Sequence, residues 1–153
     1  MTTTVYFFHV LFAFAAIAFL VVPGAMMEMA AHTRDVPFIR RMYQMGKFHG
    51  QIGGPLALLA ALVGLFAAWR LGIPWTSGWL VAAYVVFALI MLLGIGYHTR
   101  REIRIGALAQ ASPDAAPSPE LAAVIDDPLS RPVLWASGLL WILLIWLMVA
   151  KPF

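Results

Sequence analysis

The chain has 153 residues, of which 63% are hydrophobic and only 11% are charged. Soluble domains are about half apolar and about one quarter charged, so this composition excludes a water-soluble globule and indicates a surface that faces lipid. The net charge of +3 indicates no nucleic-acid partner, because the basic residues flank apolar segments, and the lack of cysteine excludes disulfides, cysteine-ligated clusters and cysteine nucleophiles.

Four apolar segments follow one another, at about residues 5–30, 52–70, 75–97 and 131–150. A helix of about 20 residues crosses the hydrocarbon core of a bilayer, and each segment is near or above that length. The sequence therefore predicts an all-α fold, a four-helix transmembrane bundle that forms one integral membrane domain over residues 1–153.

The first apolar segment has no basic residue before it, which indicates a retained helix rather than a cleaved signal peptide. Pro23 and Gly24 lie inside it and predict a kink or a break. In the connection that follows, residues 31–51, Phe38, Met42 and Met45 recur at helical spacing. This spacing predicts a short amphipathic helix on the cytoplasmic surface.

Spans two and three are joined by the short segment 70–74, which predicts an antiparallel hairpin. Tryptophans at 69, 75 and 79 surround its tip, as in the aromatic belt at a membrane surface. Span three is expected to continue as a helix past the membrane through Arg104.

The connection 98–130 contains an Ala-, Ser- and Pro-rich stretch, 111–119, which predicts a flexible linker. Ser118 followed by Pro119 is typical of a capped helix start, and the short helix is expected to end at 126–128. Ser130 is expected to cap the fourth span in the same way.

Basic residues indicate the orientation. Eight of the ten lie in the connections after spans one and three: Arg34, Arg40, Arg41, Lys47, Arg100, Arg101, Arg104 and Arg131. Since cytoplasmic connections carry an excess of Lys and Arg, both connections are predicted to be cytoplasmic and both termini outside. We expect a multi-pass protein of the bacterial inner membrane that contacts anionic lipid through Arg40, Arg41, Arg100 and Arg101.

The four histidines fall into two groups under this topology. His9 lies toward the outer end of span one, whereas His32, His49 and His98 lie at cytoplasmic ends. A continuous helix would separate His9 from His32 by about 35 Å, so they cannot share a metal. His9 could ligate haem, relay a proton or bond a neighbouring carbonyl. His49 and His98 are the most plausible paired ligands, the alternative being hydrogen bonds at the membrane interface.

Two further groups could assist a ligand. Glu28 and His32 share a helical face, so they could form a metal site, a proton-handling couple or a plain ion pair. Lys47 and His49 place donors at one membrane depth, which would suit a propionate, a quinone oxygen or a lipid phosphate. Methionines 26, 27 and 29 are more typical of soft packing than of copper ligation.

The expected ligands are therefore few. His9, Lys47, His49 and His98 are the candidates for a cofactor, and His9, Glu28 and His32 are the candidates for a metal. No residue is assigned a catalytic role, because no nucleotide-binding loop, zinc motif or nucleophile elbow occurs.

His9, the pair Arg40–Arg41 and the glycines at 50, 53 and 54 form a pattern with the Trp-flanked hairpin. This pattern resembles a bacterial family of uncharacterised four-helix integral membrane proteins. The family is distantly similar to HemJ-type protoporphyrinogen oxidases and to copper-resistance D-type membrane domains. The resemblance implies that His9 matches the first-span histidine implicated in haem binding. HemJ-type proteins carry a lysine near the third span that is missing here, so the resemblance does not carry over the oxidase activity.

The sequence is compatible with three functions. We expect a haem- or quinone-associated redox protein. The alternative is a non-catalytic accessory or assembly subunit that packs onto a larger membrane complex, or onto further copies of itself, through its glycine-rich faces. A transporter-like carrier is a third reading, which the scarcity of charged groups within the spans weakens.

Overall fold

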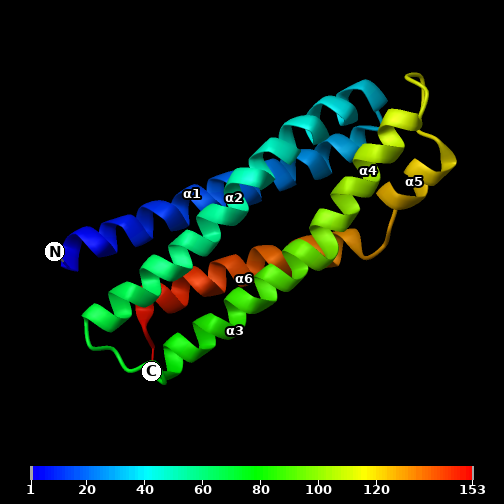
Figure 1. Ribbon diagram of the computed structural model, residues 1–153. Coiled ribbons are helices and arrows are strands. Elements are labelled where there is room, and N and C mark those ends of the chain that lie inside the picture. Colours follow the sequence, from blue (N-terminus) through cyan, green and yellow to red (C-terminus); the bar gives the residue numbers. More distant parts are fainter. Residues whose placement is uncertain (1, 153) are drawn as a thin grey trace. The chain divides into compact units, whose positions relative to one another are not determined.

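The computed structural model describes residues 2–152, and in this range it contains helices and turns but no strand (Figure 1). The elements are α1 (Thr2–Thr33), α2 (Val36–Arg70), α3 (Gly78–Leu93), the π-helical segment η1 (Gly94–Thr99), α4 (Arg100–Ala111), α5 (Pro119–Ile125) and α6 (Ser130–Ala150). The single domain predicted over 1–153 includes Met1 and Phe153, which lie outside the described residues, and it stays a prediction.

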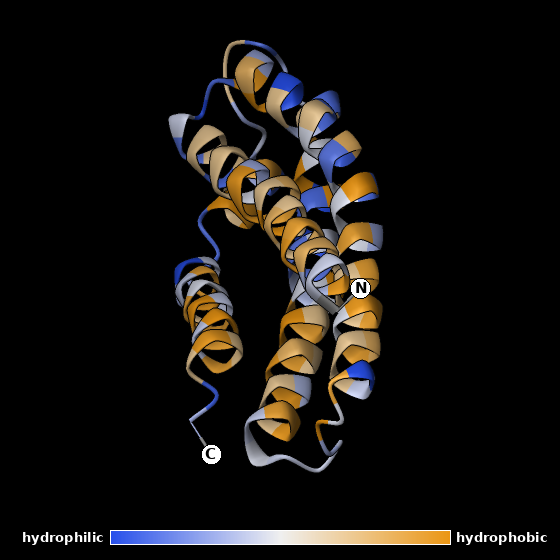
Figure 2. Ribbon diagram, turned by 90° about the vertical axis from the view of Figure 1, so that its left-hand side faces the viewer, coloured by the Kyte–Doolittle hydropathy of each residue, from blue (hydrophilic) through white to orange (hydrophobic). Residues whose placement is uncertain are grey.

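Four helical stretches are long and apolar enough to span a membrane: Thr3–Thr33, Val36–Arg70, Gly78–Ala111 and Pro119–Ala150. This confirms the prediction of an all-α protein with four spans. Figure 2 shows the long helices mostly in the colour of apolar residues, with hydrophilic residues mainly at helix ends and in connections. Such a surface is stable in lipid and unstable in water.

The chain forms two compact units. One consists of Met1–Thr33 and Arg41–Trp75, and the other of Arg34–Arg40 and Thr76–Phe153. The first unit is built from α1 and most of α2, and the second from the remaining helices.

Small residues let α1 and α2 approach each other closely in the first unit. A Cβ atom added to Gly53 would lie 2.7 Å from Leu20, and one added to Gly64 would lie 2.7 Å from the His9 ring. At Gly46 the added atom would lie 2.1 Å from the sulfur of Met27. The contacts pair the start of one helix with the end of the other, so the helices are antiparallel. Membrane helices commonly pack through such small residues.

α2 is a single helix, whereas the sequence predicted a separate amphipathic helix followed by a span that begins near residue 52. The helix passes through five glycines and Pro55 without a break. Glycine lowers helix stability by about 1 kcal/mol relative to alanine, but it allows the contacts with Leu20 and Met27 that offset this cost. α1 likewise continues through Pro23, so the predicted break is wrong.

α2 ends where the sequence predicted a turn. Gly72 has a φ of +67°, and the amide of Ile73 donates to the carbonyl of Ala68 at 3.0 Å. This arrangement is a Schellman cap, which requires a left-handed residue after the helix and therefore favours glycine. The connection to α3 is short, as predicted, while the packing of spans two and three as a hairpin stays a prediction.

In the second unit α3 packs against α6. The buried cluster consists of Ala83, Val86, Ile90 and Leu147, with Leu140, Trp141 and Leu144 packed around it. Span three continues as a helix through η1 into α4, as predicted, but one stretch of it adopts π-helical hydrogen bonding.

The most deeply buried large side chains of the described residues lie away from the α1–α2 and α3–α6 contacts described above. They come from the start of α2, from α4 and from α5: Val36, Ile39, Ile105, Leu121 and Ile125. We call segment 34–40, α4 and α5 together the polar-end core. The connection that the sequence treated as a linker and a short helix thus has a small hydrophobic core of its own.

The helix start at Ser118 is confirmed. Its hydroxyl accepts the amide of Leu121 at 3.2 Å, and Pro119 is the first helical residue. The predicted cap at Ser130 is wrong, because Ser130 is the first residue of α6 and is buried. The Asp127 carboxylate instead accepts the amide of Leu129 at 3.0 Å.

Candidate functional site

His9 lies on α1 and meets a backbone carbonyl of α2. Its Nδ1 atom is 2.8 Å from the carbonyl oxygen of Ala60, and the residue is half-buried. The ring fits here because Gly64, one turn further along α2, has no side chain that would occupy the same space. Tyr6 lies beside the ring, with centroids 6.4 Å apart.

This contact determines which nitrogen of the neutral ring carries the proton. A carbonyl oxygen only accepts, so Nδ1 of His9 carries the proton and donates it to Ala60. Nε2 then bears a lone pair, and no described residue supplies a partner for it. Histidines that bind metals are commonly held in this way, with one nitrogen donating to a carbonyl and the other free to coordinate.

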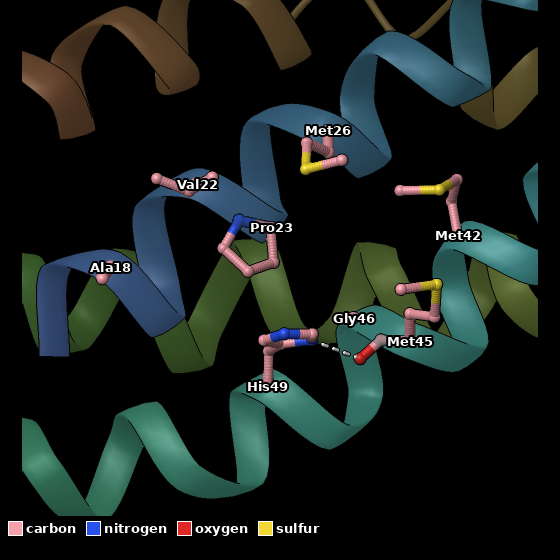
Figure 3. A pocket seen from close by; sticks show the side chains of 8 residues that line it. All are labelled: Ala18, Val22, Pro23, Met26, Met42, Met45, Gly46 and His49. Atoms are coloured by element: carbon pink, nitrogen blue, oxygen red, sulfur yellow. Dashed lines mark hydrogen bonds between the residues drawn. The ribbon is translucent and has the colours of Figure 1, made fainter. Parts of the chain in front are cut away.

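A second histidine, His49, lines a cavity of about 180 Å³ between α1 and α2 (Figure 3). The other lining residues are Ala18, Val22, Pro23, Met26, Met42, Met45 and Gly46. The Nδ1 atom of His49 lies 2.8 Å from the carbonyl oxygen of Met45, so this ring also presents Nε2 with a lone pair. Phe19 lies against the ring, with centroids 5.5 Å apart.

Glu28 and His32 form the ion pair that their spacing predicted. Oε1 of Glu28 lies 3.3 Å from Nε2 of His32. The pair is far from His9, because α1 is continuous and separates His9 from His32 by about 35 Å. The described residues contain no group of three His, Cys, Asp or Glu side chains arranged for a metal. His9, Glu28 and His32 are thus not brought together.

His98 lies in the second unit, within η1. Its Nε2 atom is 2.9 Å from the hydroxyl of Ser137, and the hydroxyl of its neighbour Tyr97 donates to Asp127 at 3.1 Å. His49 belongs to the first unit. The structure therefore gives each of these two histidines its own partner, and their pairing as ligands stays a prediction. Lys47 is exposed.

The arginines predicted to contact lipid differ in their surroundings. Arg41 and Arg100 are exposed. Arg40 donates to the carbonyls of Ala109 and Ser112 and to the Asp114 carboxylate, and Arg101 points to the last carbonyls of α5. Arg40 and Arg101 thus form hydrogen bonds within the polar-end core.

Sequence reasoning missed two sets of residues at these sites. The carbonyl of Ala60 and the space above Gly64 cannot be read from side-chain types, because backbone atoms and an absent side chain supply them. Met42 and Met45 share one helix face with His49, a predicted cofactor ligand, at positions i, i+3 and i+7. The spacing of these two methionines was interpreted as the apolar side of a surface helix instead.

Residues 3–152 match a family model described as "Predicted integral membrane protein (DUF2269)". The comparison with curated proteins found no match, and neither did the comparison with solved structures. Kinship with HemJ-type oxidases or copper-resistance D-type domains therefore has no support beyond the sequence pattern. Because the family model covers nearly the whole chain, this protein is an integral membrane protein of the DUF2269 family.

Proposed function

We propose that this protein is a haem-associated protein of the bacterial inner membrane, and that His9 would hold the haem iron. The observation that carries the proposal is the hydrogen bond from Nδ1 of His9 to the carbonyl of Ala60, 2.8 Å long. It leaves the Nε2 lone pair to bind iron. His9 lies among apolar and aromatic residues, where a solitary histidine commonly has a functional purpose.

The same hydrogen bond favours haem over a quinone. A quinone presents carbonyl oxygens, which need a donor, but the proton of His9 is already used by Ala60. Iron needs a lone-pair donor, and this is what Nε2 offers. When bound, haem would supply one-electron chemistry. His9 would supply the nitrogen that holds the iron, since His32 lies at the far end of the same helix.

The test is a titration of the purified full chain, in detergent, with haemin. We expect a Soret band that saturates at one haem per chain, and His9→Ala should abolish it. His32→Ala is the matched control, since it removes a histidine from the far end of the same helix and should leave the band intact. An unchanged band in His9→Ala, or no band in the unaltered chain, contradicts the proposal.

An accessory subunit is the second candidate. Gly50 and Gly54 lie one helical turn apart on α2, and a Cβ added to either meets no atom within 4 Å. Unlike Gly46, Gly53 and Gly64, they serve no close contact among the described residues, so they are open to another helix. Gly50→Leu with Gly54→Leu should then release a partner chain that co-purifies with the unaltered protein. If nothing co-purifies in a fixed ratio, the accessory role fails.

A further inference from the structure

The cavity between α1 and α2 gathers three thioethers and one imidazole. Met42, Met45 and His49 follow one face of α2, and Met26 faces them from α1. In Figure 3 the side chains of Met42 and Met45 extend from α2 toward α1, and His49 rises between Met45 and Pro23. Apolar residues supply the remaining walls, so these four side chains are the ligating groups that line the cavity among the residues that the structure describes.

The thioether and imidazole groups determine which metal ion the cavity can bind. Thioether sulfur is a soft donor that prefers Cu(I), whereas Mg²⁺ and Ca²⁺ require oxygen donors that this cavity lacks. The imidazole is in the correct form, because its Nδ1 proton is donated to the Met45 carbonyl. With no cysteine in the chain, no thiolate competes for the ion.

The size of the cavity also favours a metal ion over an organic ligand. Pockets for organic ligands measure about 300–1,000 Å³. A volume of about 180 Å³ is too small for a haem or a quinone but sufficient for an ion surrounded by side chains. The cavity is not closed over by the chain itself, since Met26 and Met45 are 48% and 55% exposed.

The cavity depends on a close contact next to it. Met27 is buried and its sulfur covers Gly46, where a Cβ atom would lie 2.1 Å away. Gly46 thereby brings α2 near enough to α1 for Met26 and Met42 to line one space.

We propose that Met26, Met42, Met45 and His49 form a Cu(I) site. It is separate from the site at His9, because almost five turns of α1, about 25 Å, lie between His9 and Met26. It does not rest on the haem proposal. The kinship with copper-resistance domains has no support from the comparisons, so the side chains alone carry this inference.

The experiment is a competition between the purified full chain and a chromogenic Cu(I) chelator, under anaerobic and reducing conditions. We expect one Cu(I) per chain, with sulfur ligands in the X-ray absorption spectrum. Met42→Leu with Met45→Leu should weaken binding by at least about tenfold, because two ligands are lost while the packing volume is kept. His49→Gln should also weaken Cu(I) binding.

Met29→Leu is the matched control. Met29 lies three residues from Met26 on the same helix, is 71% exposed and does not line the cavity. Its loss should leave the affinity for Cu(I) unchanged. The proposal is overturned if the unaltered chain competes no better than the double variant, or if Met29→Leu weakens binding as much. The haem titration is independent, so either proposal can fail alone.

Discussion

Individual glycines of α2 have opposite roles at neighbouring positions. Gly53 faces α1, where an added Cβ would lie 2.7 Å from Leu20 and 3.2 Å from the backbone of Phe19. Gly54 is next in sequence, yet a Cβ added there meets no atom within 4 Å. Since the backbone of Phe19 cannot move aside as a flexible side chain can, Gly53 tolerates substitution poorly.

We therefore predict that Gly53→Ala destabilises the protein by about 1–3 kcal/mol, the range for overpacking at a close contact. Gly54→Ala should be neutral or stabilising by up to about 1 kcal/mol, because alanine is the better helix former. Thermal unfolding in detergent measures both variants. Equal melting temperatures for the two would show that α1 and α2 do not meet at Gly53.

At the residue scale, the sequence predicted three possible roles for His9. One of them, a bond to a neighbouring carbonyl, is present in the structure, and it leaves Nε2 available for a ligand. What the sequence could not show was the acceptor, because the carbonyl of Ala60 is brought to His9 only by the pairing of two helices. The ion pair of Glu28 and His32 was predictable, since both residues lie on one helix.

At the scale of elements, one arginine connects the start of α2 to the end of α4. Arg40 is half-buried and donates to the Ala109 carbonyl at 2.7 Å, to the Ser112 carbonyl and to the Asp114 carboxylate. The last carbonyls of a helix lack partners within the helix, so a cation is favourable there. Arg41, its neighbour, is exposed.

Arg40→Ala should accordingly destabilise the polar-end core by about 1.5–3 kcal/mol, the cost of losing charged hydrogen bonds. Arg41→Ala is the matched control and should change stability little. Hydrogen exchange at the amides of α4 and α5 measures the effect where it arises. Equal protection in the two variants is the outcome that would contradict the role of Arg40.

The cap of α5 provides a second test at this scale. Ser118→Ala removes the hydroxyl that accepts the Leu121 amide, which should cost about 1 kcal/mol. Ser118→Asp keeps an acceptor at the same place and should retain the stability. Faster exchange of the α5 amides in the alanine variant alone is expected; the same increase in both variants would mean that capping is not the cause.

Helix starts and ends were easier to predict than the interiors of the helices. Ser118 and Pro119 form a local signal, and so do Gly72 and the turn around it. The continuity of α2 was not predictable from its glycines, because the contacts at Gly46 and Gly53 that offset their cost lie on another helix. The polar-end core was missed for the same reason: Val36, Ile105 and Leu121 are far apart in sequence.

At the scale of the whole molecule, the number of spans was predictable because composition and length determine it. The distribution of Arg and Lys predicts the orientation of the chain in the membrane. Because the chain has no cysteine, single introduced cysteines can test this prediction. Leu71→Cys, beside the tip of α2, should react with a membrane-impermeant maleimide in whole cells. Ala116→Cys, in the second connection, should react only after the cells are opened. The reverse pattern would invert the topology.

The basic connections also predict contact with anionic lipid. Arg41→Glu with Arg100→Glu changes two exposed residues and should reduce the anionic lipid that co-purifies, since each arginine near the surface contributes about 1 kcal/mol. Arg70→Glu, at the opposite end of α2, is the control and should retain the lipid. Equal lipid content in all three proteins would mean that these arginines serve orientation only.

The proposed binding of a haem iron by Nε2 of His9 can be tested with a variant that leaves a cavity in place of the imidazole. In His9→Gly the imidazole is removed while the rest of α1 stays in place, so added imidazole can occupy the vacant space. The absorption spectrum of the haemin-loaded variant should lack the Soret band of the unaltered chain and should regain it when imidazole is added. A band that persists in His9→Gly without imidazole would contradict the claim.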